Sequence, residues 1–273
     1  MSDLHVCING RGVTAKSGLT ILEAARAAGI SIPSLCHHPA VANHGACRIC
    51  VVEVKGMRGL QTACTCPVTE GMEVATETDA IAAGRRFVLE LLFSERNHYC
   101  MFCQVSGDCE LQALAYRYGL DHWRYPRPHQ PLALDASHPY IIMEPNRCIL
   151  CTRCARACAE IAGSHTLGLS ERGSDTMLVA DLGVPLGEST CVGCGTCLQV
   201  CPTGALLDAR SAYGGHEEEI THTRTTCMQC SLGCPLDVQS RGSRLLKVNG
   251  VWGAEPSAGL LCADGRFVPL AER

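Results

Sequence analysis

Hydrophobic and polar positions alternate in the first part of the chain and so predict short strands. Four such strands are expected, at residues 5–8, 12–14, 51–54 and 71–74. Asn9-Gly10 stands between the first two and is a strong hairpin-turn signal. Apolar residues at helical spacing predict one helix over 20–28, ended by Gly29. Residues 1–79 are therefore expected to form a small β-rich unit.

The rest of the chain divides into four further segments. Residues 80–120 favour helices, at 82–93 and at 110–118 before Gly119. Residues 121–146 are interpreted as an irregular linker because they hold five prolines: Pro126, Pro128, Pro131, Pro139 and Pro145. Residues 147–210 contain two near-copies of one Cys run. Residues 211–226 are polar and are expected to be a second linker, with 217–219 as a solvated acidic face. The last Cys set lies within 220–273.

Cysteine is the residue type that most changes this picture. The chain has 273 residues and 21 Cys, but only 4% aromatic residues. No signal peptide or long apolar stretch is visible, so we expect a cytoplasmic protein without a membrane span. Crowded thiols in such a compartment indicate metal binding rather than disulfides. The net charge of −4 gives no reason to expect nucleic acid as a partner.

The first set of thiols has the spacing Cys36-x10-Cys47-x2-Cys50-x13-Cys64. Four thiolates from one long loop and one later loop can hold a [2Fe-2S] cluster, with two sulfurs on each iron. The alternative is a zinc site on the same residues. Nearby histidines do not stand at the spacing of a Rieske centre. Cys7 is expected to be a core thiol on a strand, and Cys66 a spectator.

The order of Cys motifs resembles that of a known family. It resembles the N-terminal iron–sulfur region shared by the large iron–sulfur subunit of respiratory complex I, iron-only hydrogenases, NAD-linked formate dehydrogenases and the diaphorase small subunit of bidirectional NAD-linked [NiFe] hydrogenases. The resemblance covers essentially the whole chain. It implies an α+β, modular fold that opens with a plant-type ferredoxin β-grasp domain.

The second set fits the resemblance through Cys100, Cys103 and Cys109. Three Cys leave one iron of a [4Fe-4S] cluster without a thiolate, and the family fills that position with a His before the first Cys. The resemblance thus implies His98 as the fourth ligand, in a small helical domain. The family spacing is usually His-x3-Cys, whereas here it is His-x-Cys. The alternative is a surface His before a turn. The stretch RNHYC looks more like the hydrogenase diaphorase subunit than like complex I.

Two runs of bacterial ferredoxin type form the strongest signal. The first run is Cys148, Cys151, Cys154 and Cys158, and the second run is Cys191, Cys194, Cys197 and Cys201, followed by Pro202. In such runs the fourth Cys ligates the other cluster. One [4Fe-4S] cluster is then expected on Cys148, Cys151, Cys154 and Cys201, and the other on Cys191, Cys194, Cys197 and Cys158.

The C-terminal set is Cys227, Cys230, Cys234 and Cys262. With the stretch KVNGVWGAEPSAGLLCADGRF it resembles the small [4Fe-4S] domain that opens molybdopterin oxidoreductases. A zinc site is again the alternative. The chain ends 11 residues after Cys262, so no pterin-binding catalytic body is expected in it.

Together these sets predict one [2Fe-2S] and four [4Fe-4S] clusters, which use nineteen of the 21 Cys and His98. No nucleotide-binding motif is present, so we expect an electron conduit with no substrate site of its own. The resemblance implies a subunit of an NAD(P)H-linked oxidoreductase, with a [NiFe] hydrogenase favoured and an NAD-linked formate dehydrogenase second. Its expected partners are a flavin-containing NAD(P)H-binding subunit, a catalytic subunit and also ferredoxin. The alternatives are a stand-alone polyferredoxin and a zinc-bound structural protein.

Overall fold

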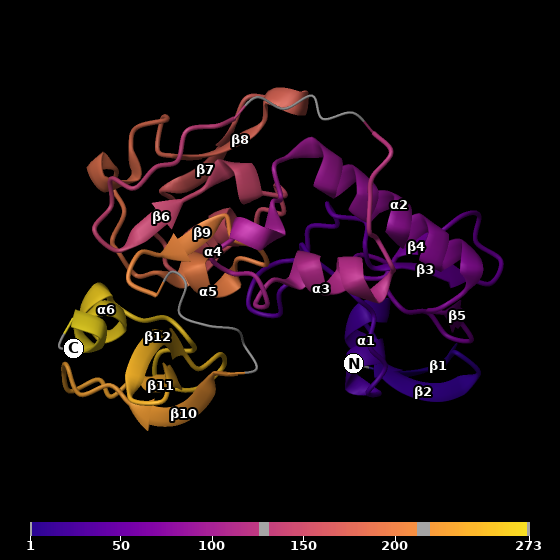
Figure 1. Cartoon of the computed structure of the whole chain (residues 1–273). Coiled ribbons are helices and arrows are strands. Elements are labelled where there is room, and N and C mark those ends of the chain that lie inside the picture. Colours follow the sequence, from indigo (N-terminus) through magenta and orange to yellow (C-terminus); the bar gives the residue numbers. More distant parts are fainter. Residues whose placement is uncertain (1, 126–130, 212–218, 272–273) are drawn as a thin grey trace. The chain divides into compact units, whose positions relative to one another are not determined.

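The computed structural model describes residues 2–125, 131–211 and 219–271, which form two compact units (Figure 1). Unit 1 comprises residues 1–38, 42–95 and 113–128. Unit 2 comprises residues 39–41, 96–112 and 129–273. The described residues contain no helix that is both long and apolar enough to cross a membrane.

Unit 1 begins with a five-stranded sheet in the order β2-β1-β5-β3-β4. Its strands are β1 (Asp3–Ile8), β2 (Arg11–Lys16), β3 (Val51–Val54), β4 (Gln61–Thr62) and β5 (Glu73–Ala75). The β1–β2 turn has Asn9 at φ 52° and Gly10 at φ 77°, as the hairpin signal predicts. Helix α1 (Ile21–Ala27) starts at a capping box of Thr20 and Glu23 and buries its apolar face in the core beside the sheet.

Helix α2 (Asp79–Glu95) is longer than predicted, beginning three residues before 82 and ending two residues after 93. Its Arg85 is fully buried and donates to Ile49 O, on the loop that carries the first Cys set, and to Val51 O at the start of β3. Helix α3 (Glu110–Arg117) leads into Tyr118, whose hydroxyl accepts a further bond from Arg85.

In the ferredoxin-like part of unit 2, each Cys run begins on a loop and continues into the short helix that follows. These helices are α4 (Arg153–Glu160) and α5 (Thr196–Val200), and their N-caps, Thr152 and Gly195, both have left-handed φ values. The strands form two antiparallel pairs, β6 (Ile141–Met143) with β9 (Leu206–Asp208), and β7 (Leu167–Ser170) with β8 (Met177–Ala180). Single-turn 3₁₀ helices occur at η1 (Cys100–Phe102), η2 (Pro145–Arg147), η3 (Gly173–Asp175) and η4 (Leu186–Glu188).

The prediction that 121–146 is wholly irregular is wrong at its end. Strand β6 lies between Pro139 and Pro145 and pairs with β9, so this stretch belongs to the ferredoxin-like fold. A strand of only three residues between two prolines gives no recognisable pattern in the sequence. Pro126 and Pro128 lie outside the described residues.

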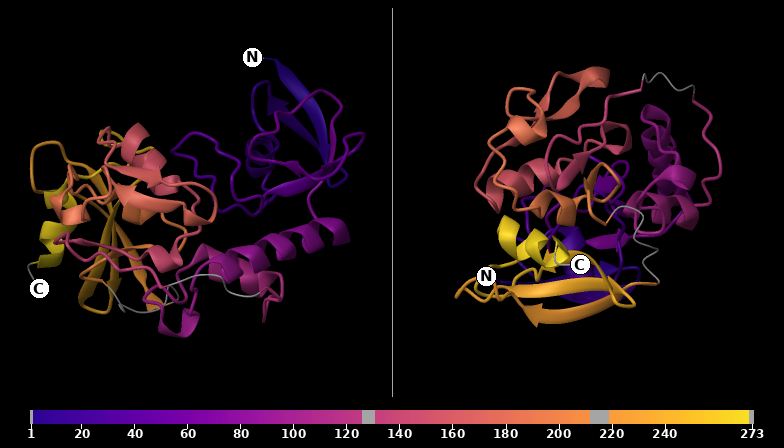
Figure 2. Two further views of the ribbon diagram at one scale, coloured as in Figure 1. Left: turned by 90° about the horizontal axis from the view of Figure 1, so that it is seen from above. Right: turned by 60° about the vertical axis from the view of Figure 1, so that its left-hand side comes forward.

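The C-terminal part of unit 2 is an antiparallel sheet in the order β10-β11-β12, with helix α6 (Ala263–Ala271) beside it in both views of Figure 2. The strands are β10 (Thr221–Thr226), β11 (Pro235–Arg241) and β12 (Arg244–Gly250). The prediction of a linker over 211–226 is therefore wrong from 221 onward. All six residues of β10 are exposed and non-apolar, so backbone pairing forms the strand without a hydrophobic pattern. Glu217 and Glu218 lie outside the described residues.

Candidate iron–sulfur sites

The four thiols of the first set converge in the interior of unit 1. Cys36, Cys47, Cys50 and Cys64 are all buried. The backbone N–H groups of Leu35 and Cys36 donate to Cys47 Sγ at 3.4 and 3.3 Å, and Cys47 N–H donates to Cys36 Sγ at 3.5 Å. Amides that face sulfur in this way favour the anionic thiolate that a cluster needs.

Hydrogen bonds between the side chains of these four cysteines shift the pKa values of their thiols. Hydrogen bonds from Cys47 and Cys64 hold the pKa of Cys36 well below its ordinary value, and the same contacts raise the pKa of both donors. A bond from Cys64 lowers the pKa of Cys50 to about 7. These contacts link all four thiols, which fits the donor set of a [2Fe-2S] cluster. The loop needs Gly45, at φ 75°, because a Cβ there would lie 3.0 Å from a side-chain carbon of Thr65.

The second set gathers at the start of helix α3. The amides of Gln112 and Leu111 point to Cys109 Sγ, while burial raises the pKa of this thiol to about 12. Cys103 and Cys100 lie close enough for their charges to raise that pKa further. His98 precedes them and is buried at 8% exposed, which does not match the alternative of a surface His. Its coordination of iron stays a prediction.

Segments distant in sequence enclose this second set. Cys109 Sγ lies 3.7 Å from Pro202 O, and Glu110 N–H donates to the same oxygen at 3.0 Å. A Cβ at Gly204 would lie 3.0 Å from Cys103 Sγ. The second set therefore lies directly against the end of the second Cys run.

The fourth cysteine of each run lies near the other run. Burial and the charges of Cys201 and Cys148 raise the pKa of Cys151 to about 12. Burial raises the pKa of Cys154 well above its ordinary value, and the charges of Cys151, Cys201 and Cys148 raise it further.

The pKa of Cys197 is shifted in the same way by two other cysteines of the second run and by Cys158. Burial raises its pKa, with further contributions from Cys194, Cys191 and Cys158. The structure thus brings Cys201 to the first run and Cys158 to the second.

The C-terminal set is half-exposed. Cys227 and Cys234 are buried and joined by a backbone hydrogen bond of 2.8 Å, whereas Cys230 and Cys262 are exposed. The Sγ atoms of Cys227 and Cys262 lie 3.2 and 3.6 Å from the position of a Cβ on Gly265. The structure therefore brings Cys227, Cys234 and Cys262 together, with Cys230 on the exposed turn after Cys227.

The two cysteines outside these sets are partly exposed. The prediction that Cys7 is a core thiol is wrong, because strand alternation turns Val6 and Ile8 inward and Cys7 to the other face. Burial raises the pKa of Cys66, whose Sγ lies 3.8 Å from Pro67 O.

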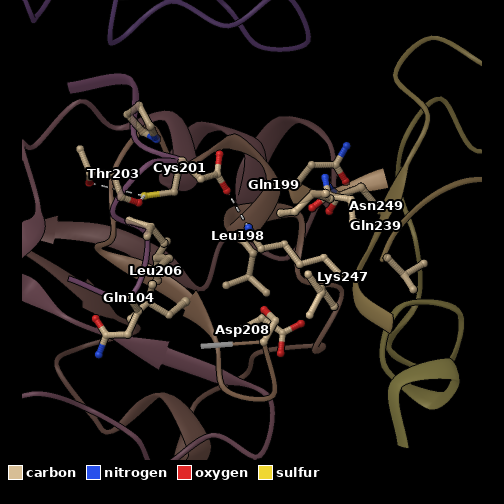
Figure 3. Close-up of a pocket in the computed structure, with 18 of the residues that line it drawn as sticks. Gln104, Leu198, Gln199, Cys201, Thr203, Leu206, Asp208, Gln239, Lys247 and Asn249 are labelled. Carbon is tan, nitrogen blue, oxygen red and sulfur yellow. Dashed lines mark hydrogen bonds and ion pairs between the residues drawn. The ribbon is translucent and has the colours of Figure 1, made fainter. Parts of the chain in front are cut away.

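A polar cavity of about 260 Å³ borders Cys201 in unit 2 (Figure 3). Gln199, Asp208 and Lys247 line it, and Arg266 contributes to its wall. Burial raises the pKa of Asp208, and Lys247 Nζ is paired with Asp108 at 2.8 Å. Sequence reasoning missed this cavity, because it forms between segments that are distant in sequence and has no local pattern.

Family models match along the chain in the order of these sites. A "2Fe-2S iron-sulfur cluster binding domain" matches residues 2–79, and an "NADH-ubiquinone oxidoreductase-G iron-sulfur binding region" matches 85–124. An "NADH-quinone oxidoreductase subunit 3, ferredoxin-like domain" matches 138–207, and a "Molybdopterin oxidoreductase Fe4S4 domain" matches 220–270. The chain thus carries one 2Fe-2S domain and several 4Fe-4S domains in a modular α+β fold.

A chain in the crystal structure of an NAD⁺-reducing [NiFe]-hydrogenase in the H₂-reduced state is 37% identical to this one. The match covers 78% of this chain and 91% of that chain, with a TM-score of 0.74. The chain belongs to the iron–sulfur subunit family shared by NAD-linked hydrogenases and NADH-quinone oxidoreductases. The resemblance seen in the sequence is therefore confirmed.

Longer members of this iron–sulfur subunit family match between 76% and 97% of the chain. An NADH-quinone oxidoreductase subunit of Rhizobium meliloti (strain 1021) is 35% identical over 97% of this chain and 31% of its own length. The NADPH-Fe(3+) oxidoreductase subunit alpha of Geobacter sulfurreducens is 34% identical, with the same two coverages. The NADP-reducing hydrogenase subunit HndD of Solidesulfovibrio fructosivorans is 38% identical over 76% of this chain and 36% of its own length. The chain spans about a third of the length of these curated relatives.

Proposed function

We propose that the chain is an electron-transfer iron–sulfur subunit of a multi-subunit NAD(P)H-linked oxidoreductase of the bidirectional or electron-bifurcating [NiFe] hydrogenase type. It relays electrons between a flavoprotein subunit and a catalytic subunit. The observation that carries the proposal is that cysteines of the same set lie close together, in a chain that matches 91% of its counterpart from an NAD⁺-reducing hydrogenase.

The proposed ligands are the residues of these five sets. One [2Fe-2S] cluster takes Cys36, Cys47, Cys50 and Cys64, and four [4Fe-4S] clusters take the other sets. Those sets are His98 with Cys100, Cys103 and Cys109; Cys148, Cys151, Cys154 and Cys201; Cys191, Cys194, Cys197 and Cys158; and Cys227, Cys230, Cys234 and Cys262. Thiolate-rich donor sets with facing amides suit iron–sulfur chemistry, in which a bound cluster accepts and gives up one electron at a time.

Contacts within unit 2 support a relay because they hold neighbouring sites against one another. Pro202 O accepts from Glu110 N–H, which joins the second set to the ferredoxin-like part. Arg153 extends this junction by donating to both carboxylate oxygens of Glu110, at 2.6 and 2.9 Å, and to Val200 O. A bidentate pair made by a buried arginine holds its two segments in a fixed geometry.

An NAD-linked formate dehydrogenase is the second candidate. The match of residues 220–270 to the Fe4S4 domain of molybdopterin oxidoreductases favours it. In either assembly the chain would work with a flavin-containing NAD(P)H-binding subunit and a separate catalytic subunit.

The test is anaerobic co-purification from the native host with a tag on this chain. We expect a flavoprotein to co-purify, and NADH or NADPH to bleach the brown visible absorption of the complex. The co-purifying catalytic subunit then decides between hydrogen and formate as substrate. The isolated chain serves as the control and should not be reduced by NAD(P)H. Reduction without flavin would contradict the relay, and absence of any flavoprotein would favour a free polyferredoxin.

A further inference from the structure

Arg266 on helix α6 is a buried cation at the junction of two proposed cluster sites. It is 2% exposed. Its Nε donates to Cys194 O at 2.7 Å, and Nη1 donates to Val248 O at 2.9 Å and Asn249 Oδ1 at 3.1 Å. Nη2 donates to Gln199 Oε1 at 3.1 Å. One side chain thus joins the second Cys run to strand β12.

All four acceptors of this guanidinium are electrically neutral. Within the described parts of the chain no carboxylate forms an ion pair with Arg266, whereas the buried Arg85 and Arg153 each have a Glu partner. Asp208 borders the same cavity and its charge acts on Arg266, but its carboxylate forms no ion pair with the guanidinium and accepts from the backbone N–H of Arg210. A guanidinium stays protonated in proteins, so Arg266 carries its positive charge. An unpaired buried charge is strongly unfavourable, so a counter-charge is expected close by.

Besides Asp208, the anionic groups that act on Arg266 belong to the second Cys run. Cys194 and Cys197 are the thiols whose charge acts on Arg266. A Cβ at Gly195 would contact Arg266 Cδ, so the arginine stem packs on the peptide that follows Cys194. Arg266 N–H also donates to Cys262 O at 3.2 Å, one turn after a proposed ligand of the C-terminal cluster.

We propose that Arg266 is the counter-charge of the cluster at Cys191, Cys194, Cys197 and Cys158, and that it sets the reduction potential of this cluster. The inference rests on the proposed function, since it requires that cluster to be present. A four-thiolate [4Fe-4S] cluster is anionic and gains one more negative charge on reduction. A fixed cation in a dry, low-dielectric site stabilises the reduced state more than the oxidised state, which raises the potential.

The test is a redox titration of the purified holoprotein, followed by electron paramagnetic resonance of each cluster. In Arg266→Met we expect about a tenfold fall in the equilibrium constant for one-electron reduction of this cluster, which is about 59 mV. Arg266→Lys keeps the charge and should stay within about threefold of wild type. Lys247→Met is the matched control: it removes one positive charge from the same cavity, but a partly exposed and paired one, and should change the potential little.

A second variant tests the same charge without removing the arginine. Asn249→Asp places a carboxylate against Nη1 and should lower the potential in the same direction as Arg266→Met. An unchanged potential in Asn249→Asp overturns the proposal, even if Arg266→Met loses the cluster. Equal shifts in Arg266→Lys and Arg266→Met also overturn it, because hydrogen-bond geometry rather than charge would then be responsible. Wild-type protein with no signal from this cluster would refute the proposed function instead.

Discussion

Replacing Arg85 by Met should loosen the loop that carries the first thiol set. Arg85 is fully buried and serves two buried carbonyls, Ile49 O at 3.0 Å and Val51 O at 2.8 Å. Met fills much of the same space but donates no hydrogen bond. Each buried carbonyl left without a donor costs about 1–3 kcal/mol, so two cost about 2–6 kcal/mol. We expect a destabilisation of unit 1 by about 3 kcal/mol, which is roughly a hundredfold in its opening equilibrium.

Hydrogen exchange measured by mass spectrometry on the intact holoprotein reports this opening. Peptides that cover β3 should exchange about a hundredfold faster in Arg85→Met than in wild type. Arg86→Met is the matched control, because Arg86 is the next residue on α2 but is 44% exposed. Its effect should stay within about 0.5 kcal/mol. Exchange in Arg85→Met within about threefold of wild type would refute the reasoning.

Three further substitutions test individual sites. Cys201→Ser should impair the cluster of Cys148, Cys151 and Cys154, and a loss confined to the Cys191 cluster by electron paramagnetic resonance would show the pairing to be wrong. Gly204→Ala should reduce the iron bound at the second set, because the new Cβ would lie 3.0 Å from Cys103 Sγ. Gly168→Ala is the control, because a Cβ there meets open space. Equal iron contents in the two variants would contradict the prediction. Substitution of Cys7 and Cys66 together by Ser should leave the iron content unchanged, and any loss of iron would place one of them among the ligands.

The parts of the fold predicted best are those set by local chemistry. Asn9-Gly10 makes a hairpin because both residues adopt positive φ readily, and Thr20 with Glu23 starts α1 where the pattern places it. The spacing of the Cys sets likewise reflects loops that must bring several sulfurs to one point. In each case, neighbouring residues carry enough information to specify the geometry.

The parts that could not be predicted depend on partners distant in sequence. Strand β10 has no apolar residue, so only its pairing with β11 identifies it. Burial of Arg85 and Arg266 has no local signature, since the N–H groups of each side chain donate to carbonyls from other segments. The signal that could have drawn attention to Arg266 is its position four residues after Cys262.

Iron and acid-labile sulfide in the anaerobically purified chain test the central claim most directly. One [2Fe-2S] and four [4Fe-4S] clusters correspond to about 18 iron atoms and about 18 sulfides per chain. We predict these values, together with a brown colour and no stoichiometric zinc. An iron content of about 14 atoms per chain would mean that one of the four-iron sites does not bind its cluster. Stoichiometric zinc with little iron would contradict the account.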